Sequence, residues 1–528
     1  MSMQRYDLLL DKFIDHAAKW HPTAEVVTSG GGDIPATRIG YAGLRERSNL
    51  LSGAFAALGL KLGDRIATLA WNSQAHMECW YAALGIGVVC HTLNPRIGAA
   101  QLADMVRQAG DRVLAASPDQ TAMVEELVAT CPSIDHVLIL DEPGAEELAW
   151  PRSSRVRIWS QRDLIEQLGA DIAWGGFDEN AEAGLCFTSG TTGAPKGVVY
   201  THRSNYLLTL GILQADAMAL GARDSILAAV PMFHANGWGL PFAAPAVGAR
   251  FVLPGRHNDG ASLAALIERE QVTIAIGVAT VWIGLIDHLD ATGGSLPSLQ
   301  RVLLGGSSVP QALMDRIEQR LGVTVQTSWG MTELSPLGTV TPANTVDRIS
   351  ARSGRPLVGV DLRVADAEGL ALAEQRGAEG RLQVRGASVV DRYFGHDEPA
   401  TDAEGWFDTG DLAVIDGDGQ LAITGRSKDL IKSGGEWINP GEIEAIIGAL
   451  PAVGLVAVIG RAHPKWGERP VLVIEERRGQ SVNDAQLTDA LSGRVPRWWM
   501  PDDIVRLDPM PLAYTGKIDK RELRRRLG

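Results

Sequence analysis

The hydrophobic and polar positions in the first part of the chain alternate between two periods. A helical pattern covers residues 41–60 and 75–84, whereas short apolar runs typical of buried strands cover 65–70 and 87–90. Strands and helices that alternate in this way are typical of a mostly parallel sheet with helices on its faces. We therefore expect a layered α/β fold here, preceded by an amphipathic helix within residues 1–20.

The same alternation continues through the middle of the chain. A helix is expected at 203–220, and apolar strands at 301–304 and 323–327 run into glycine-containing segments at Gly305 and Gly330. Ligands of open α/β sheets collect at the carboxyl ends of the strands. These two strand ends therefore predict a nucleotide crevice.

The pattern changes after residue 353 to short alternating segments, such as 361–364 and 421–424, which favour an antiparallel β subdomain. The end of the chain mixes helices and strands on the scale of a small α+β domain. At 528 residues, the chain exceeds what one core usually serves. We expect an α/β protein with a large N-terminal domain of layered α/β sheets plus the antiparallel subdomain, residues 1–425, and a small C-terminal domain, residues 426–528.

Charge and cysteine content narrow the class of protein. The chain has 49 Lys and Arg against 63 Asp and Glu, a net charge of −14, and no long basic run, which argues against nucleic acid or an anionic membrane as partner. No apolar segment is long enough to be an integral membrane span. The four cysteines lack the spacing of a zinc site or a disulfide framework and indicate a reducing, cytoplasmic location.

The segment TSGTTGAPKG, residues 188–197, has the composition of a phosphate-binding loop. Its glycines permit backbone angles that aim successive N–H groups at one anion, its hydroxyls add donors, and Lys196 adds a positive charge. A proline before the lysine and a glycine after it exclude the Walker type of loop. A solvated hairpin loop is the alternative. The predicted contact residues are Thr188, Ser189, Gly190, Thr191, Thr192, Gly193 and Lys196.

Five motifs taken in order resemble those of the adenylate-forming superfamily, which includes acyl-CoA synthetases. They are the loop at 188–197, SWGMTE at 328–333, TGD at 409–411, GRSKD at 425–429 and TGK at 515–517. The resemblance implies that a carboxylate attacks the α-phosphorus of ATP, that pyrophosphate leaves, and that a thiol then displaces AMP. Such a reaction needs positive charge and oriented donors where negative charge develops.

The resemblance also implies a role for each motif in the larger domain. The phosphate loop would hold the β- and γ-phosphates, Thr332 would contact the α-phosphate, and Glu333 would hold Mg²⁺. Asp411 would accept hydrogen bonds from the ribose, with Arg426 beside it. Adenine would lie between two segments, and Trp329 would keep the stacking face that many relatives have there. These segments contain Gly305, Gly306, Ser307, Ser328, Trp329 and Gly330.

In the small domain, the resemblance implies that Lys517 is the catalytic lysine of adenylation and that Lys428 is the hinge about which the domain moves. After this movement, Gly434, Gly435, Glu436 and Trp437 would line a pantetheine channel. The thiol is expected to be free coenzyme A, because the chain stops eleven residues after Lys517 and no carrier domain follows.

The acid is the least constrained substrate. FHANGWGLP, residues 233–241, resembles medium- and long-chain fatty acyl-CoA synthetases and 3-methylmercaptopropionate-CoA ligases. The expected pocket is lined by His234, Trp238, Val278, Gly305 and Gly330, with His234 also a catalytic candidate beside Lys517, Thr332 and Glu333. Glycine at 330, where acetate-activating relatives have tryptophan, favours a larger acid. Ordinary core positions for His234 and Trp238 are the alternative.

We expect an AMP-forming ligase for a medium or long apolar acid, with ATP, Mg²⁺ and coenzyme A. An aryl or thioether acid ligase of the same mechanism is a second interpretation, and an acyl-adenylate-binding protein without turnover is a third. A homodimer is expected by analogy with the family.

Overall fold

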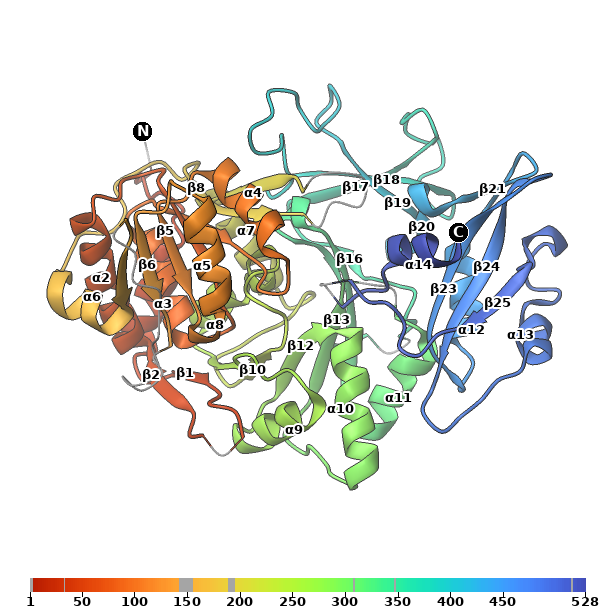
Figure 1. The fold of residues 1–528 in the computed structure, drawn as a ribbon, viewed down its shortest axis with the longest axis horizontal. Helices are drawn as coiled ribbons and strands as arrows, with labels where there is room; N and C mark the ends of the chain where they lie inside the picture. Colours follow the sequence, from red (N-terminus) through yellow and green to blue (C-terminus); the bar gives the residue numbers. More distant parts are fainter. Residues whose placement is uncertain are drawn as a thin grey trace.

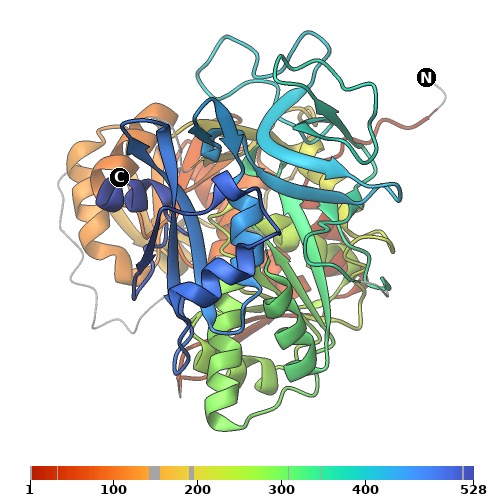
Figure 2. The same ribbon diagram turned by 90° about the vertical axis from the view of Figure 1, so that its right-hand side faces the viewer.

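The computed structural model describes residues 3–32, 34–141, 155–188, 195–306, 309–345, 348–513 and 516–528. Its larger part is built on two extensive sheets, and a smaller unit formed by the end of the chain lies to one side of them (Figure 1). Figure 2 shows this smaller unit, in blue, face on. Among the described helices, none combines the length and apolar character needed to cross a membrane.

The first sheet has seven strands in the order β7-β6-β5-β3-β4-β8-β9, and only the β8–β9 pair is antiparallel. Every residue of β4 and β5 is buried, as expected for parallel strands covered on both faces. The strands are β3 (Arg65–Leu69), β4 (Val89–Thr92), β5 (Val113–Ala116), β6 (His136–Ile139), β7 (Arg157–Ser160), β8 (Glu182–Phe187) and β9 (Gly197–Thr201).

The second sheet has nine strands in the order β16-β15-β14-β13-β12-β10-β11-β1-β2. Its central strands are parallel, and antiparallel pairs occur only toward its two edges. The strands are β1 (Glu25–Thr28), β2 (Thr37–Gly40), β10 (Ser225–Ala228), β11 (Arg250–Leu253), β12 (Ile274–Val278), β13 (Arg301–Gly305), β14 (Thr324–Gly330), β15 (Leu337–Val340) and β16 (Arg355–Pro356).

Helices cover both faces of each sheet and form the layer between them. Apolar residues of α1, α2, α3 and α8 share one core with both sheets, whereas α4 and α5 cover the far face of the first sheet and α9, α10 and α11 that of the second. The bounds are α1 (Asp11–Trp20), α2 (Tyr41–Ala57), α3 (Gln74–Gly85), α4 (Ala99–Ala109), α5 (Thr121–Thr130), α6 (Gln161–Leu168), α7 (His202–Ile212), α8 (Leu240–Val247), α9 (Gly260–Arg269), α10 (Ala279–Thr292) and α11 (Gln311–Leu321).

An antiparallel sheet, β17-β18-β19-β20, follows and leads directly into the smaller unit. That unit packs helices against a mixed sheet of its own, and its helix α12 lies against β20. The strands are β17 (Val360–Ala365), β18 (Glu379–Gly386), β19 (Phe407–Ile415), β20 (Leu421–Arg426), β21 (Ile431–Ser433), β22 (Glu436–Ile438), β23 (Val453–His463), β24 (Gly467–Glu476) and β25 (Asp503–Arg506). The helices are α12 (Pro440–Gly448), α13 (Asp484–Leu491) and α14 (Lys520–Leu527).

The expected fold class is confirmed: layered α/β sheets, an antiparallel subdomain and a small α+β unit. Two expected helices are shorter than predicted. The helix expected at 203–220 ends at Ile212, where the backbone N–H of Met218 turns back to bond the Ile212 carbonyl at 3.0 Å. The N-terminal helix begins only at Asp11.

Candidate active site

The carboxyl ends of β12 and β13 form one wall of the site. Val278 pairs with Gly305 in the sheet register, and a Cβ atom placed on Gly305 would lie 2.9 Å from Cη2 of Trp238. A Cβ on Gly306 would lie 3.5 Å from Val278 Cγ1 and 3.7 Å from Lys517 Cε. The structure therefore brings together three expected pocket residues, Trp238, Val278 and Gly305, with Gly306 and the expected catalytic lysine, although Lys517 comes from the other end of the chain.

A left-handed turn holds Trp238 at this wall. Five consecutive residues, 235–239, have φ between 39° and 76°, and Trp238 itself has φ 55°. Such angles are costly for a bulky residue and persist only where surrounding packing fixes them. Trp238 is buried at 9% exposure, with the end of its indole ring against Gly305. The sequence indicated Trp238 as a pocket residue but did not predict the left-handed turn that positions it.

His234 precedes this turn and is neutral at physiological pH. Burial, together with the charges of Lys517 and Arg96, lowers its pKa to about 4. Its Nε2 atom is buried and has no hydrogen-bond partner among the described residues. An orphaned imidazole nitrogen beside the pocket wall can serve a ligand as a neutral donor or acceptor, depending on its tautomer.

Gly330 has a packing reason for lacking a side chain. A Cβ atom there would lie 2.1 Å from the Pro336 carbonyl oxygen and 3.0 Å from Leu337 Cα, which are backbone atoms that cannot move aside cheaply. The bulge between Trp329 and Gly330 in the β14–β15 pair produces this approach. The glycine is thus explained by the neighbouring strand, and its presence does not by itself indicate a large acid pocket.

Asp411 is buried in β19 beside residues from two neighbouring elements. Its Oδ2 atom accepts a hydrogen bond from Trp329 Nε1 at 2.9 Å, and its Oδ1 atom lies 2.7 Å from Arg426 Nε in an ion pair. The β19–β20 register places Arg426 directly opposite Asp411. Apart from this ion pair, Oδ1 has no hydrogen-bond partner among the described residues. It can therefore accept a hydrogen bond from a ligand hydroxyl.

Trp329 acts here through its N–H group. Its ring packs into the core under the antiparallel sheet, close to Gly338, whose Cβ would lie 2.5 Å from Trp329 Cζ3. Sequence reasoning gave this residue a stacking role and did not anticipate the bond to Asp411.

The turn after β14 carries Thr332 and Glu333. Tyr200 Oη donates to the Thr332 carbonyl at 2.9 Å, and Tyr393 Oη donates to Glu333 Oε1 at 3.0 Å. Burial is the largest cause of a raised pKa at Glu333, opposed by the hydrogen bond from Tyr393 and the charge of Arg426. Neither tyrosine was singled out from the sequence, because nothing in the local pattern around them points to a site.

The ends of the phosphate-loop candidate are closed on each other. The Thr188 N–H donates to the Lys196 carbonyl at 2.9 Å, and the Lys196 N–H donates to Thr188 Oγ1 at 3.4 Å. The Lys196 ammonium lies 4.6 Å from the ring centroid of Tyr393, so it faces the side that carries Glu333. Six expected contact residues lie outside the described residues: Ser189, Gly190, Thr191, Thr192, Gly193 and Ser307.

Lys517 reaches the cleft from the smaller unit. A Cβ on the preceding Gly516 would lie 3.0 Å from Thr280 Oγ1 and 3.6 Å from Val278 Cγ2, so this segment rests on the wall formed by β12. Lys517 is exposed, yet the protein around its ammonium removes much of its hydration. That loss, followed by repulsion from Arg426, lowers the pKa of Lys517 to about 8 despite attraction from Asp411.

The residues expected to line a pantetheine channel lie on the β21–β22 hairpin. Gly434 and Gly435 form its turn with φ of 62° and 94°, and Trp437 is 52% exposed. The described contacts of this hairpin include β24, β23 and Trp466. Lys428 lies in the short turn Ser427–Asp429 that follows Arg426.

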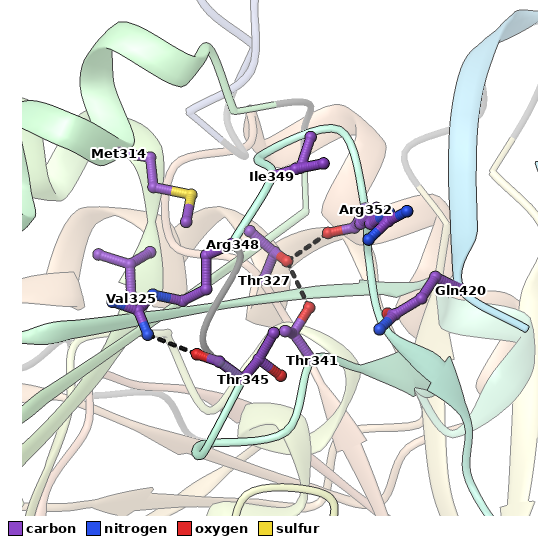
Figure 3. Close-up of a pocket in the computed structure, with 9 residues that line it drawn as sticks. All are labelled: Met314, Val325, Thr327, Thr341, Thr345, Arg348, Ile349, Arg352 and Gln420. Carbon is purple, nitrogen blue, oxygen red and sulfur yellow. Dashed lines mark hydrogen bonds between the residues drawn. The ribbon is translucent and has the colours of Figure 1, made fainter. Parts of the chain in front are cut away.

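A hollow behind β14 is distinct from this cleft. Figure 3 shows it between β14 and the following segment, where Thr327 bonds Thr341 and the Arg352 carbonyl. Its volume of about 10 Å³ is room for about one water molecule. It can hold neither a nucleotide nor an acyl chain.

The described residues contain no group of three or more His, Cys, Asp or Glu side chains that could hold a metal ion. Mg²⁺ usually binds through one or two carboxylates plus substrate phosphates and water. A single buried carboxylate, Glu333, facing the phosphate-loop lysine fits that pattern.

Residues 14–394 match the AMP-binding enzyme family, and residues 442–517 match the AMP-binding enzyme C-terminal domain. The chain belongs to the AMP-binding enzyme family. It is 40% identical to the 3-methylmercaptopropionyl-CoA ligase of Ruegeria lacuscaerulensis, covering 99% of this chain and 98% of that protein. It is 39% identical to the medium-chain-fatty-acid–CoA ligase of Ectopseudomonas oleovorans, covering 100% of this chain and 97% of that protein.

Two solved structures share the fold of this chain. The anthranilate CoA ligase AuaEII in complex with anthranoyl-AMP superposes with a TM-score of 0.87 at 22% identity, covering 99% of this chain and 97% of that one. ATP-bound MatB from Rhodopseudomonas palustris superposes with a TM-score of 0.85 at 24% identity, covering 99% of each chain.

As a member of the AMP-binding enzyme family with acyl-CoA ligases as its relatives, the protein is an AMP-forming acid–thiol ligase. The family resemblance and the enzyme class expected from the sequence are confirmed. The comparisons give no support to a binding protein without turnover.

Proposed function

We propose that this ligase activates a medium- to long-chain carboxylic acid with ATP and transfers it to coenzyme A. The observation that carries the proposal is the apolar wall of Trp238, Val278 and Gly305 directly beside Lys517. Relatives that span almost the whole chain support it, among them the medium-chain ligase and, at 38% identity, the long-chain-fatty-acid–CoA ligase of Thermus thermophilus.

In the first half-reaction, a carboxylate oxygen attacks the α-phosphorus of ATP, and the bond to pyrophosphate breaks. Lys517 places positive charge where the carboxylate and ATP meet, and Thr332 contacts the α-phosphate. Asp411 accepts a hydrogen bond from a ribose hydroxyl at its Oδ1 atom. Adenine lies along Gly305, Gly306 and Ser328. Glu333 would hold Mg²⁺, which would supply positive charge beside the leaving pyrophosphate.

In the second half-reaction, the thiol sulfur of coenzyme A attacks the carbonyl carbon of the acyl-adenylate, and AMP leaves with the bonding electrons. The smaller unit, residues 426–528, rotates about Lys428 and replaces Lys517 with the β21–β22 hairpin. Gly434 and Gly435 let the pantetheine arm pass close to backbone, and Glu436 and Trp437 flank it. The hairpin pairs with β24, whereas Lys517 lies against Gly306, and these different positions support this division of labour.

We also propose a cytoplasmic homodimer. Four buried, unpaired cysteines and a requirement for ATP and coenzyme A support the compartment. Met3, Tyr6 and Trp20 are 82%, 62% and 63% exposed, and apolar side chains near the N-terminus are candidates for a subunit interface. Light scattering coupled to size-exclusion chromatography tests the dimer: a monomer mass at micromolar concentration contradicts it.

Competition between acids tests the substrate class. The ligase is incubated with octanoate, palmitate, 3-methylmercaptopropionate and ferulate in one mixture, and the CoA thioesters are quantified by mass spectrometry. Octanoyl- or palmitoyl-CoA as the main product supports the proposal. A predominance of 3-methylmercaptopropionyl-CoA favours the second candidate, which the 40% identical relative supports, and feruloyl-CoA favours an aryl acid.

A further inference from the structure

One segment without regular secondary structure, residues 387–394 after β18, contacts two parts of the site at once. The Val390 N–H donates to the Glu333 carbonyl at 2.8 Å, and the Phe394 N–H donates to the Gly197 carbonyl at 2.8 Å. The segment is therefore bonded through its backbone to the Glu333 turn at one end and to the end of the phosphate loop at the other.

Tyr393 lies between these two backbone hydrogen bonds and makes one contact with its hydroxyl and another with its ring. Its hydroxyl donates to Glu333 Oε1 at 3.0 Å, and its ring carries the Lys196 ammonium at 4.6 Å from the centroid. A phenol that must donate to a carboxylate fixes that carboxylate in one orientation, and an ammonium over an aromatic face is held by the ring quadrupole.

We infer that Tyr393 is a positioning residue that sets the carboxylate of Glu333 and the ammonium of Lys196 at a fixed separation, so that metal and pyrophosphate are bound together. The inference rests on the proposed roles of Glu333 and Lys196. Partners that orient a metal-binding carboxylate commonly change metal affinity by 10- to 100-fold when removed. Tyr393 would not touch the reacting atoms.

Two substitutions of Tyr393 remove different contacts. Tyr393→Phe removes only the hydroxyl and keeps the ring beside Lys196, whereas Tyr393→Leu removes both the hydroxyl and the aromatic ring. Tyr41→Phe is the matched control, because it removes a buried hydroxyl that donates to the Ala249 carbonyl at 2.6 Å, away from this site. Thermal melting of all three variants reports whether each still folds.

Two readouts test the inference: the Mg²⁺ concentration that half-saturates ATP–pyrophosphate exchange, and calorimetric binding of ATP with and without Mg²⁺. Tyr393→Phe is expected to raise the half-saturating Mg²⁺ about tenfold or more while leaving metal-free ATP binding unchanged. Tyr393→Leu is expected to weaken metal-free ATP binding as well. Tyr41→Phe is expected to change neither, and a half-saturating Mg²⁺ for Tyr393→Phe within twofold of the parent overturns the inference.

Glu333→Gln separates this inference from the proposed function. If Glu333→Gln raises the half-saturating Mg²⁺ and Tyr393→Phe does not, Tyr393 has no positioning role although the metal site stands. If Glu333→Gln itself leaves the Mg²⁺ dependence unchanged, the proposed metal role of Glu333 is wrong and the inference falls with it. Low thermal stability of Tyr393→Phe alone, without a Mg²⁺ effect in the folded fraction, also contradicts it.

Discussion

Lys517 lies against Gly306, with its Cε atom 3.7 Å from where a Cβ would be. This relationship joins the smaller C-terminal unit to the strand ends of the nine-stranded sheet, and it places the ammonium in the same cleft as Asp411 and Arg426. The arrangement therefore brings together groups proposed for the first half-reaction, whereas the β21–β22 hairpin proposed for the second pairs with β24.

Lys517→Ala is expected to abolish adenylation and to spare thioester formation. The lysine contributes its charge only while carboxylate and ATP are joined, so a supplied acyl-adenylate bypasses the need for it. ATP–pyrophosphate exchange measures the first step, and CoA thioester formed from synthetic acyl-adenylate measures the second. A comparable loss in both steps would refute the assignment.

The pKa of Lys517, lowered to about 8, predicts how activity depends on pH. The protonated ammonium is the active form, so kcat/KM for ATP in the exchange reaction should be level below pH 8 and fall about tenfold per pH unit above it. Lys517→Arg keeps its charge throughout this range. Any exchange that the arginine variant retains should lack the decline, and a parent profile that stays flat to pH 9.5 contradicts the prediction.

Trp329→Phe is expected to raise KM for ATP although Trp329 lies in the core. It removes the 2.9 Å hydrogen bond to Asp411 and leaves a buried carboxylate oxygen without that donor. The free energy of unfolding should fall by about 1–3 kcal/mol, the usual cost of an unsatisfied buried group. Because Asp411 loses its orientation, KM for ATP should rise while KM for coenzyme A stays constant. Denaturant unfolding and steady-state kinetics check the two effects.

Two glycine substitutions should behave differently. Gly330→Ala drives a methyl group against the Pro336 carbonyl oxygen at 2.1 Å and should destabilise the protein by about 1–3 kcal/mol. Gly305→Ala brings a methyl group to 2.4 Å from Ser328 Oγ and 2.9 Å from Trp238 Cη2, which are side-chain atoms at the proposed pocket wall, so it should shift acid preference toward shorter chains. Gly98→Ala, whose Cβ meets nothing within 4 Å, is the control. An unchanged chain-length profile for Gly305→Ala contradicts the pocket assignment.

The sequence predicted features that have a local signal. Fully buried parallel strands such as β4 appear as apolar runs, and the strands expected before Gly305 and Gly330 are present as β13 and β14, which pair side by side. The place of β1 beside β11 has no local signal, because residues more than two hundred positions apart form that pair. The left-handed turn at 235–239 was equally inaccessible, because tertiary packing imposes positive φ on Ala235 and Trp238.

The candidate site residues that belong to sequence motifs could be named from the sequence. The residues that hydrogen-bond to these motifs from distant parts of the chain could not. Asp411 and Glu333 stand in recognisable segments, whereas Tyr393 and Tyr200 act through long-range hydrogen bonds. At Gly330, which favoured a larger acid in the sequence, the approach of the Pro336 backbone adds a packing reason for the missing side chain that no local signal showed.

The central claim is that the chain forms an acyl-adenylate from an apolar carboxylic acid in the cleft that Lys517 completes. ATP–pyrophosphate exchange with a series of straight-chain acids from acetate to palmitate tests it most directly. Strong exchange is expected with medium- and long-chain acids, little with acetate, and none with any acid in the Lys517→Ala variant. Absence of exchange with every acid, or exchange that survives in Lys517→Ala, would contradict it.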